Sequence, residues 1–261
     1  MSNTKYKYIY GPVSSWRLGS SLGIDLLSQD RKICTFNCLY CQLGGFEEYT
    51  NQRKAYVPTK DVMAEIKSLP DVKIDYFTFS GRGEPTLAKN LGEAINELRK
   101  IRKEQIAVLT NSTLLQNEEV RKELALADYV ALKLDACSQA TLESINKPAP
   151  EIKFDELLES IKIFRNNFSG TTALQMMFVD ENEGYAEKFV ELAREIAPDE
   201  VQINTPLRAC RVKPLSKEKL HRIKELFSSL PMEIKCVYEA ERKEAAVISK
   251  EDTLKRRGCT N

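Results

Sequence analysis

Three cysteines, Cys34, Cys38 and Cys41, lie on one short stretch with CxxxCxxC spacing, and Tyr40 directly precedes the last of them. Thiolate is a soft ligand that selects iron-sulfur clusters, zinc or Cu(I). Structural zinc needs four ligands, but the chain has no second cysteine pair, and its only histidine is the distant His221. Three thiolates can instead hold three irons of a cubane cluster and leave the fourth open to a small molecule. The stretch therefore predicts a reactive iron-sulfur centre.

A second polar stretch, SGRGEPT at 80–86, follows a predicted strand one βα unit after the cysteines. Gly81 and Gly83 allow a backbone to approach a ligand closely, and Glu84 offers a carboxylate to an ammonium group. Asn111 and Ser112 follow the next strand, where they suit either a ribose or carboxylate ligand or the capping of a helix. Both interpretations remain open from the sequence.

Later strands also carry polar side chains. Lys133 and Asp135 alternate with leucines and therefore share one face of a strand. Since helices bury the outer face, that shared face must be the interior, where charges are costly unless paired or bound to a ligand. Gln175 and Asn204 lie on the two following strands. Because ligands of parallel α/β sheets bind at the carboxyl ends of the strands, we expect all these side chains near one site.

The elements that position these residues alternate along the chain. Predicted helices cover 60–68, 88–102, 116–126, 153–167, 185–196 and 216–229, with a weak final helix in the tail. Predicted strands cover 23–27, 74–80, 105–110, 129–135, 171–179 and 200–205, and the pattern closes with 233–238. Six strands joined by helices indicate an α/β fold with a parallel sheet and helices outside. We expect the segment 1–22 to form a shaped Gly/Pro-rich loop.

The amino-acid composition limits the class of protein to which the chain can belong. The 261 residues are 42% hydrophobic and 30% charged, and the balance of 39 Lys and Arg against 38 Asp and Glu argues neither for nor against a nucleic-acid partner. Seven unevenly spaced cysteines do not resemble a disulfide framework and suit a reducing cytoplasm. With no apolar run long enough to span a bilayer, we expect no membrane segment and a cytoplasmic location.

The motifs ICTFNCLYCQLGG, FSGRGEPTL, LTNSTLL, ALKLDACSQATLESINKP and INTPLR together resemble the radical S-adenosylmethionine (radical SAM) enzymes. Within them the chain resembles the branch of iron-sulfur oxidoreductases that includes the wyosine synthetases acting on tRNA. The resemblance implies an incomplete (β/α)6 barrel, with parallel strands inside and helices outside. We expect this core, with its N-terminal loop extension, to cover 1–240, and a short tail to cover 241–261.

The resemblance also implies the cofactors. Cys34, Cys38 and Cys41 would hold a [4Fe-4S] cluster whose fourth iron binds S-adenosylmethionine, with the backbone near Tyr40 approaching the adenine. Reductive cleavage would yield a 5′-deoxyadenosyl radical that abstracts a substrate hydrogen. No catalytic side chain is expected beyond the cluster and the cofactor pocket. That pocket would take the methionyl ammonium on Gly81, Gly83 and Glu84, the ribose and carboxylate on Asn111, Ser112, Lys133 and Asp135, and be completed by Gln175 and Asn204.

The chain departs from the wyosine synthetases because no cysteine precedes Cys34 to hold a second cluster. Four cysteines lie outside the motif, and we favour separate thiols over an auxiliary cluster because no two form a local pair. They are Cys137, Cys210, Cys236 and Cys259.

The substrate remains open between tRNA or a nucleotide and a small metabolite or protein side chain. A third possibility is a non-catalytic electron-transfer protein. Nucleic acid is favoured by side chains expected at the mouth of the site, namely Trp16, Arg17, Arg53, Lys54, Arg208 and Arg211. An enzyme of this kind implies an electron donor of the flavodoxin or ferredoxin type. The sequence does not predict an oligomeric state.

Overall fold

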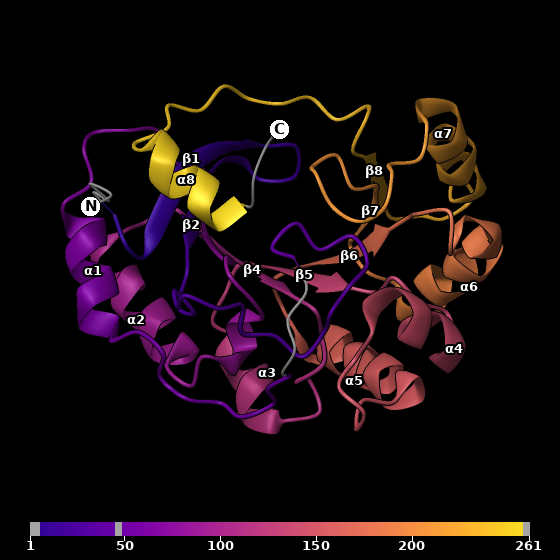
Figure 1. Cartoon of the computed structure of the whole chain (residues 1–261), viewed down its shortest axis with the longest axis horizontal. Helices are drawn as coiled ribbons and strands as arrows, with labels where there is room; N and C mark the ends of the chain where they lie inside the picture. Colours follow the sequence, from indigo (N-terminus) through magenta and orange to yellow (C-terminus); the bar gives the residue numbers. More distant parts are fainter. Residues whose placement is uncertain (1–5, 45–48, 258–261) are drawn as a thin grey trace.

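The computed structural model describes residues 6–44 and 49–257, and its strands form one sheet whose order follows the chain (Figure 1). β1 and β2 pair antiparallel, and every later neighbour pairs parallel. The strands are β1 (Ile9–Ser15), β2 (Gly19–Ile24), β3 (Tyr76–Phe79), β4 (Gln105–Thr110), β5 (Tyr129–Lys133), β6 (Thr171–Met177), β7 (Glu200–Asn204) and β8 (Glu233–Cys236). The parallel part, β2 to β8, is an incomplete barrel, as expected.

Helices cover the outer face of this curved sheet (Figure 1). α6 illustrates why they form, since Phe189, Val190, Ala193 and Ile196 recur at helical spacing and all are buried. The longer helices are α1 (Thr59–Lys67), α2 (Leu91–Ile101), α3 (Glu118–Leu124), α5 (Phe154–Asn167), α6 (Ala186–Ile196), α7 (Lys217–Leu226) and α8 (Lys250–Arg257). Shorter turns are α4 (Gln139–Thr141), which continues into a π-helix at Leu142–Asn146, and 3₁₀ turns at Pro85–Leu87 and Glu183–Tyr185.

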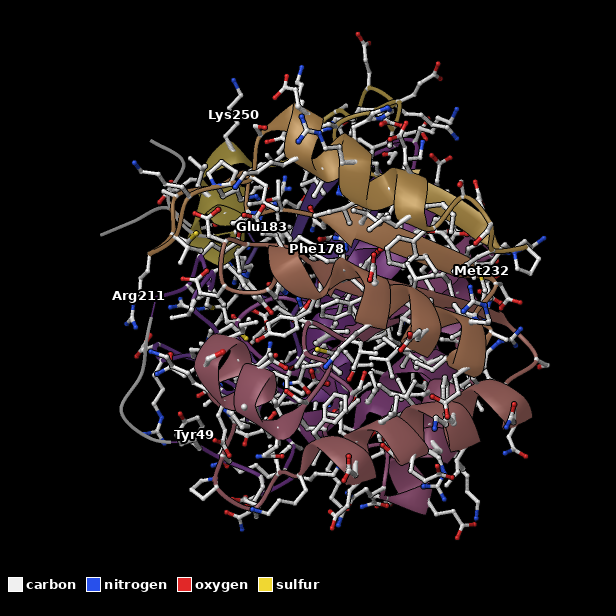
Figure 2. The ribbon with its side chains drawn as sticks, turned by 90° about the vertical axis from the view of Figure 1, so that its right-hand side faces the viewer. Tyr49, Phe178, Glu183, Arg211, Met232 and Lys250 are labelled. Atoms are coloured by element: carbon white, nitrogen blue, oxygen red, sulfur yellow. The ribbon has the colours of Figure 1, made fainter. Side chains whose placement is uncertain are left out.

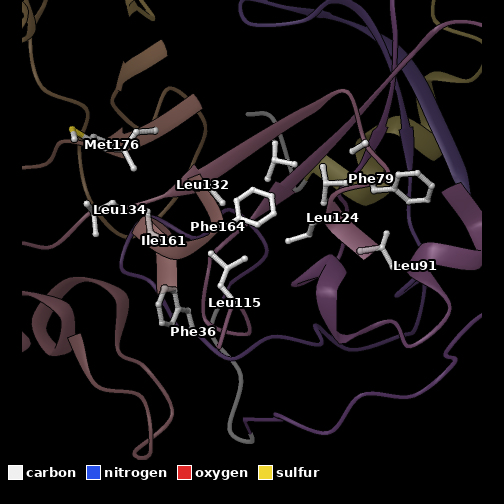
Figure 3. Close-up of a cluster of buried hydrophobic side chains, with 14 of the residues drawn as sticks. Phe36, Phe79, Leu91, Leu115, Leu124, Leu132, Leu134, Ile161, Phe164 and Met176 are labelled. Carbon is white, nitrogen blue, oxygen red and sulfur yellow. The ribbon is translucent and has the colours of Figure 1, made fainter. Parts of the chain in front are cut away.

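Alternation along the strands separates two layers. Leu132 and Leu134 lie in the main core beneath the helices, with Ile161 and Phe164 of α5 (Figure 3). Tyr129, Ala131 and Lys133 take the intervening positions and therefore face the barrel interior. The interior is consequently the layer that can carry charged and polar side chains toward a ligand.

The expectation of a loop over the segment 1–22 is wrong for its described part, and residues 1–5 lie outside the described residues. Residues 9–24 form a hairpin in which Ser15 pairs with Gly19 and Ile9 with Ile24. Pairing with an existing sheet edge outweighs the low strand propensity of this Gly/Ser-rich sequence. The hairpin turn, 16–18, lies at the amino-terminal end of β2, the opposite end from the cysteines.

The C-terminal helix α8 packs beside β1 (Figure 1). Thr253 Oγ1 accepts a hydrogen bond from the Gly11 amide at 3.0 Å, and Asp252 accepts one from the Tyr6 amide at 3.0 Å. Arg256 of α8 is only 6% exposed, and its guanidinium donates to the Lys7 carbonyl and to the Ser28 hydroxyl. Over the described ranges, no helix is long and apolar enough to cross a membrane.

Candidate metal centre

The cysteine loop, 34–41, is held on one side by the GEP loop, 80–86. Ile33 forms a parallel bridge with Gly83. Its amide donates to the Arg82 carbonyl at 3.0 Å, and its carbonyl accepts from the Glu84 amide at 2.9 Å. A Cβ on Gly83 would lie 1.6 Å from the Ile33 oxygen. Gly83 is thus required for the backbone entering Cys34 to lie against the strand end, a role that its motif alone did not indicate.

The other side of the loop runs along residues 145–149, which are the end of the π-helix and the residues after it. Leu39 donates to the Ile145 carbonyl at 2.9 Å, Asn37 to the Asn146 carbonyl at 2.9 Å, and Ala149 to the Thr35 carbonyl at 2.9 Å. Phe36, 2% exposed, anchors the loop in the main core near Leu115 (Figure 3). The cysteines therefore project from a backbone that is fixed on both sides.

Two amide side chains point at the sulfurs. Asn111 Nδ2 lies 3.7 Å from Cys34 Sγ and donates to Thr35 Oγ1 at 2.7 Å. Asn146 Nδ2 lies 3.5 Å from Cys38 Sγ. Hydrogen bonds to sulfur are among the features that tune iron-sulfur clusters. Asn146 was missed from sequence, although the INKP motif that contains it was part of the family resemblance.

A buried cation accompanies the thiols. Lys32 is 9% exposed, its Nζ donates to the Phe36 carbonyl at 3.0 Å, and it hydrogen-bonds the Cys41 thiol. Burial alone lowers the pKa of Lys32, but attraction to the three cysteine sulfurs in their thiolate form outweighs it and raises the pKa, so the ammonium stays charged beside metal-bound thiolates. Three thiolates with a buried cation beside them are a donor set that fits an anionic iron-sulfur cluster.

Without a metal, Cys34 and Cys38 would stay protonated. Burial raises the pKa of Cys34 to about 12 and also raises that of Cys38, whereas a coordinated metal deprotonates a thiol outright. Among the described residues, no three Cys, His, Asp or Glu side chains converge on a single ion position. A cubane does not require that, because its three cysteines bind three different irons.

Glu84 is 2% exposed, and burial raises its pKa. Oε1 accepts from the Thr86 amide at 3.1 Å and from the hydroxyls of Thr86 and Thr110, both at 2.7 Å. Among the described residues, Oε2 accepts a single hydrogen bond, from the Asn111 amide at 2.6 Å. The carboxylate thus ties the end of β3 to the end of β4, and Oε2 alone retains capacity for a further donor.

Both carboxylate oxygens of Asp135 already accept hydrogen bonds from the protein. Its Oδ2 accepts from the Tyr40 hydroxyl and from Asn146 Nδ2 at 2.9 Å, and its Oδ1 accepts from the Met177 amide at 2.7 Å. Lys133 Nζ lies 3.6 Å from Oδ2 and 4.9 Å from the centre of the Tyr40 ring. Asp135 therefore anchors the cysteine loop to the end of β5, while the Lys133 ammonium lies over the loop's aromatic ring.

Neither Asn111 nor Ser112 caps the next helix, because the N-cap of α3 is Asn117, whose side chain accepts from the Glu119 amide. The assignment of Asn111 and Ser112 to a ribose or carboxylate stays a prediction. Asn111 Oδ1 accepts from the Thr113 amide at 3.1 Å, as in a local turn, while its Nδ2 reaches the cysteine loop. Ser112 has a left-handed backbone with φ 71°, and its hydroxyl lies 3.3 Å from the Lys133 carbonyl.

The remaining predicted residues lie around the same interior. Gly81 has φ 130°, and a Cβ there would lie 2.4 Å from Asp25 Cγ. Gln175 is in register with Lys133 and Gln202, and Asn204 with Met177. The loops after β2, β3, β4 and β5 thus meet at the cysteines, whereas Gln175 bonds to Arg17 below them and Asn204 to its own neighbour Thr205.

Two of the side chains expected at the mouth do not lie there. Trp16 and Arg17 lie at the opposite, amino-terminal end, beside a surface pocket of about 580 Å³. Arg53 is paired with Glu119 and Glu123, and Arg208 donates to Gln42 at 2.5 Å. In Figure 2, Arg211 and Tyr49 lie on one side of the molecule, and Met232, which precedes β8, lies on the other.

The other cysteines are separate. Cys137 lies at the edge of the main core, Cys236 is buried in it, and Cys210 borders a small cluster with Tyr40, Ile145 and Val179. Cys259 lies outside the described residues. That these cysteines act as separate thiols stays a prediction.

Comparison with known proteins identifies a family whose members this chain resembles. The model of the radical SAM superfamily matches residues 31–193. A UPF0026 protein of Synechocystis sp. is 42% identical over 83% of this chain and 80% of its own length. A protein of Brachyspira hyodysenteriae named GTPase Obg is 33% identical over 97% of this chain, which spans only 38% of it. A probable GTP 3′,8-cyclase of Saccharolobus islandicus is 28% identical over 66% of this chain and 53% of its own length.

Solved structures share the fold. Streptococcus suis SuiB bound to its precursor peptide SuiA superposes with TM-score 0.64 at 15% identity, covering 82% of this chain and 48% of that one. The anSMEcpe structure with bound AdoMet superposes with TM-score 0.61 at 18% identity, covering 84% and 64%. This chain thus spans about half to two thirds of these structures. Neither the UPF0026 relative nor the GTPase Obg relative carries the wyosine synthetase name, so the resemblance is supported at the level of the superfamily.

Proposed function

Because the chain belongs to the radical SAM superfamily and, within it, to the UPF0026 proteins, we propose that Cys34, Cys38 and Cys41 are the ligands of its [4Fe-4S] cluster. When bound, the cluster and S-adenosylmethionine supply a 5′-deoxyadenosyl radical for hydrogen abstraction from a substrate. The observation that carries the assignment is the cysteine loop itself, fixed on both sides with two amide donors and a buried lysine at its sulfurs.

The surrounding residues bind and orient S-adenosylmethionine in this proposal. Gly81, Gly83 and the unsaturated Oε2 of Glu84 receive the methionyl ammonium. The other contacts are assigned to the backbone near Tyr40 for the adenine, to Asn111, Ser112, Lys133 and Asp135 for the ribose and carboxylate, and to Gln175 and Asn204 for closing the pocket. Asp135 acts through Tyr40 and Lys133 rather than through a free carboxylate edge, because its oxygens already accept three hydrogen bonds.

For the substrate we favour a nucleotide or a nucleic acid such as tRNA. The GTP 3′,8-cyclase relative, whose name specifies a nucleotide, supports this choice at 28% identity, and the resemblance to the wyosine synthetase branch supports tRNA. A protein side chain is the second candidate, because SuiB is captured with a peptide, but its 15% identity extends only to the fold. The reductant is a flavodoxin or ferredoxin, and the compartment is the cytoplasm.

The test is anaerobic reconstitution followed by reduction in the presence of S-adenosylmethionine. We expect about four irons per chain, a broad absorbance near ~400 nm, and formation of 5′-deoxyadenosine. Cys38→Ala should abolish the product, while Cys137→Ala, a change at a partly buried cysteine outside the loop, should not. A protein that binds four irons but yields no 5′-deoxyadenosine would refute the proposal.

A further inference from the structure

Arg17 lies in the hairpin turn between β1 and β2, and its side chain enters the barrel from the amino-terminal end. Its Nη1 donates to Gln175 Oε1 at 2.9 Å and lies 3.5 Å from Gln202 Oε1. The next residue, Leu18, is 3% exposed and packs on interior side chains of β4, β5 and β6, namely Ala107, Tyr129, Ala131 and Ala173. The turn therefore closes the floor of the barrel and holds a guanidinium group inside it.

One edge of this guanidinium is unused. Both hydrogen bonds are made by Nη1, and within the described chain the edge formed by Nε and Nη2 makes none. Nε is buried and has no acceptor. An unpaired buried N–H of a charged group costs free energy that a ligand can recover. Two parallel N–H groups on one edge match the oxygens of a phosphate or a carboxylate.

Charges within the barrel are consistent with an anion at this edge. The interior carboxylate Glu200 is already bound by Lys235 at 2.6 Å and by Gln202 Nε2 at 2.6 Å. Glu200 also attracts the Arg17 guanidinium through the barrel interior, but in the described part of the chain no carboxylate forms a direct ion pair with it. Lys133 is in register with Gln175, the partner of Arg17, and adds a second cation to the same interior face.

We infer that Arg17 binds an oxyanionic group of the substrate inside the barrel. The identity of that group, a phosphate, rests on the proposed nucleotide function; the need for an anion rests only on the unused guanidinium edge. Gln175 and Gln202 hold Nη1, which leaves the Nε and Nη2 edge for the ligand.

The test measures binding to the full-length, anaerobically reconstituted protein without S-adenosylmethionine, so it does not depend on radical formation. Inorganic phosphate, GMP and guanosine are titrated by calorimetry. Emission of Trp16, the only tryptophan, is followed as a second signal, because Arg17 Cζ lies 5.2 Å from its ring. We expect phosphate and GMP to bind, and GMP to bind more tightly than guanosine. Arg17→Gln should weaken the binding of both phosphate and GMP roughly 10- to 100-fold.

Lys243→Gln is the matched control. Lys243 is a 68% exposed cation that lines the surface pocket at the same end of the barrel, and its loss should leave binding unchanged. The inference is overturned if phosphate and GMP do not bind, if Arg17→Gln binds them as wild type does, or if Lys243→Gln abolishes binding. Binding of phosphate without preference for GMP over guanosine would retain the anion site and remove the nucleotide from the proposed function. Retained iron content and circular dichroism show that Arg17→Gln is folded.

Discussion

The hydroxyl of Tyr40, one residue before Cys41, donates to the carboxylate of Asp135, two residues beyond the end of β5. Asn146 donates to the same carboxylate oxygen at 2.9 Å and lies 2.9 Å from the Tyr40 hydroxyl. These three side chains come from the cysteine loop, a strand end and the π-helix, and all are buried. The position of the cysteine loop therefore depends on a polar contact with a residue far along the chain.

Tyr40→Phe tests that dependence. It removes one donor to a buried carboxylate, so the cluster-free chain should lose about 1–2 kcal/mol of unfolding free energy. A less fixed loop should also hold less than the full iron content after reconstitution. Urea midpoints and iron per chain measure the two effects.

Tyr56→Phe is the matched control, because that hydroxyl donates to the Gln52 carbonyl at 3.1 Å on the exposed surface. Its effect should stay within about 0.5 kcal/mol. Equal losses of unfolding free energy and of iron in the two variants would contradict a specific role for the hydrogen bond between Tyr40 and Asp135.

Local spacing was enough to predict the cysteine loop, the GEP loop and most strand ends. The CxxxCxxC spacing by itself predicts a metal-binding loop. The alternation of Lys133 and Asp135 with leucines predicts that both side chains lie on the same face of their strand. Each of these signals lies within a few residues, and in a parallel sheet such residues must meet at the carboxyl edge.

What escaped prediction depends on contacts between distant segments. Asn146 acquires its role from a backbone alignment with the cysteine loop, and Arg17 from the hairpin that a Gly/Ser-rich stretch forms only because a sheet edge is present. Gly83 was singled out, but its steric necessity comes from Ile33, which lies on a different segment well before it in the chain. No local pattern encodes such pairings.

Gly83→Ala should be severe. The added Cβ would lie 1.6 Å from the Ile33 carbonyl oxygen, so the backbone leading into Cys34 must move. We expect a loss of about 3 kcal/mol or more and iron binding well below four per chain. Gly184→Ala, at a site with no atom within 4 Å, should keep wild-type iron. Normal iron content in Gly83→Ala would contradict the clamping role of the GEP loop.

Lys32 should set the redox potential of the proposed cluster. Reduction adds negative charge, and the buried ammonium beside the thiols favours it. Lys32→Met should therefore lower the cluster potential by roughly 100 mV. Potentiometric titration followed by electron paramagnetic resonance measures the shift. Lys32→Arg retains the charge and should shift the potential much less. Identical potentials in all three proteins would exclude an electrostatic role for Lys32.

Asp25, directly after β2, predicts a pH dependence of stability. It is fully buried, and burial raises its pKa to about 6 despite hydrogen bonds from the Arg82 and Leu27 amides and Arg256 at 3.9 Å. A carboxyl whose pKa is raised in the folded state contributes stability that is complete below about pH 4 and lost as pH rises through about 6. Asp25→Asn lacks this titration. Its unfolding free energy relative to wild type should therefore increase by about 1 kcal/mol from pH 5 to pH 7.5.

Urea unfolding of the cluster-free chain at the two pH values, followed by circular dichroism, measures this difference. Asp61→Asn, in the first turn of α1, serves as a control for carboxylate removal elsewhere on the fold. Because Asp61 is not fully buried, its replacement should change the unfolding free energy by a similar amount at both pH values. If the curves of wild type and Asp25→Asn stay parallel between pH 5 and pH 7.5, Asp25 is ionised throughout. Arg256 of the C-terminal helix would then neutralise it, and α8 would stabilise the hairpin through that ion pair.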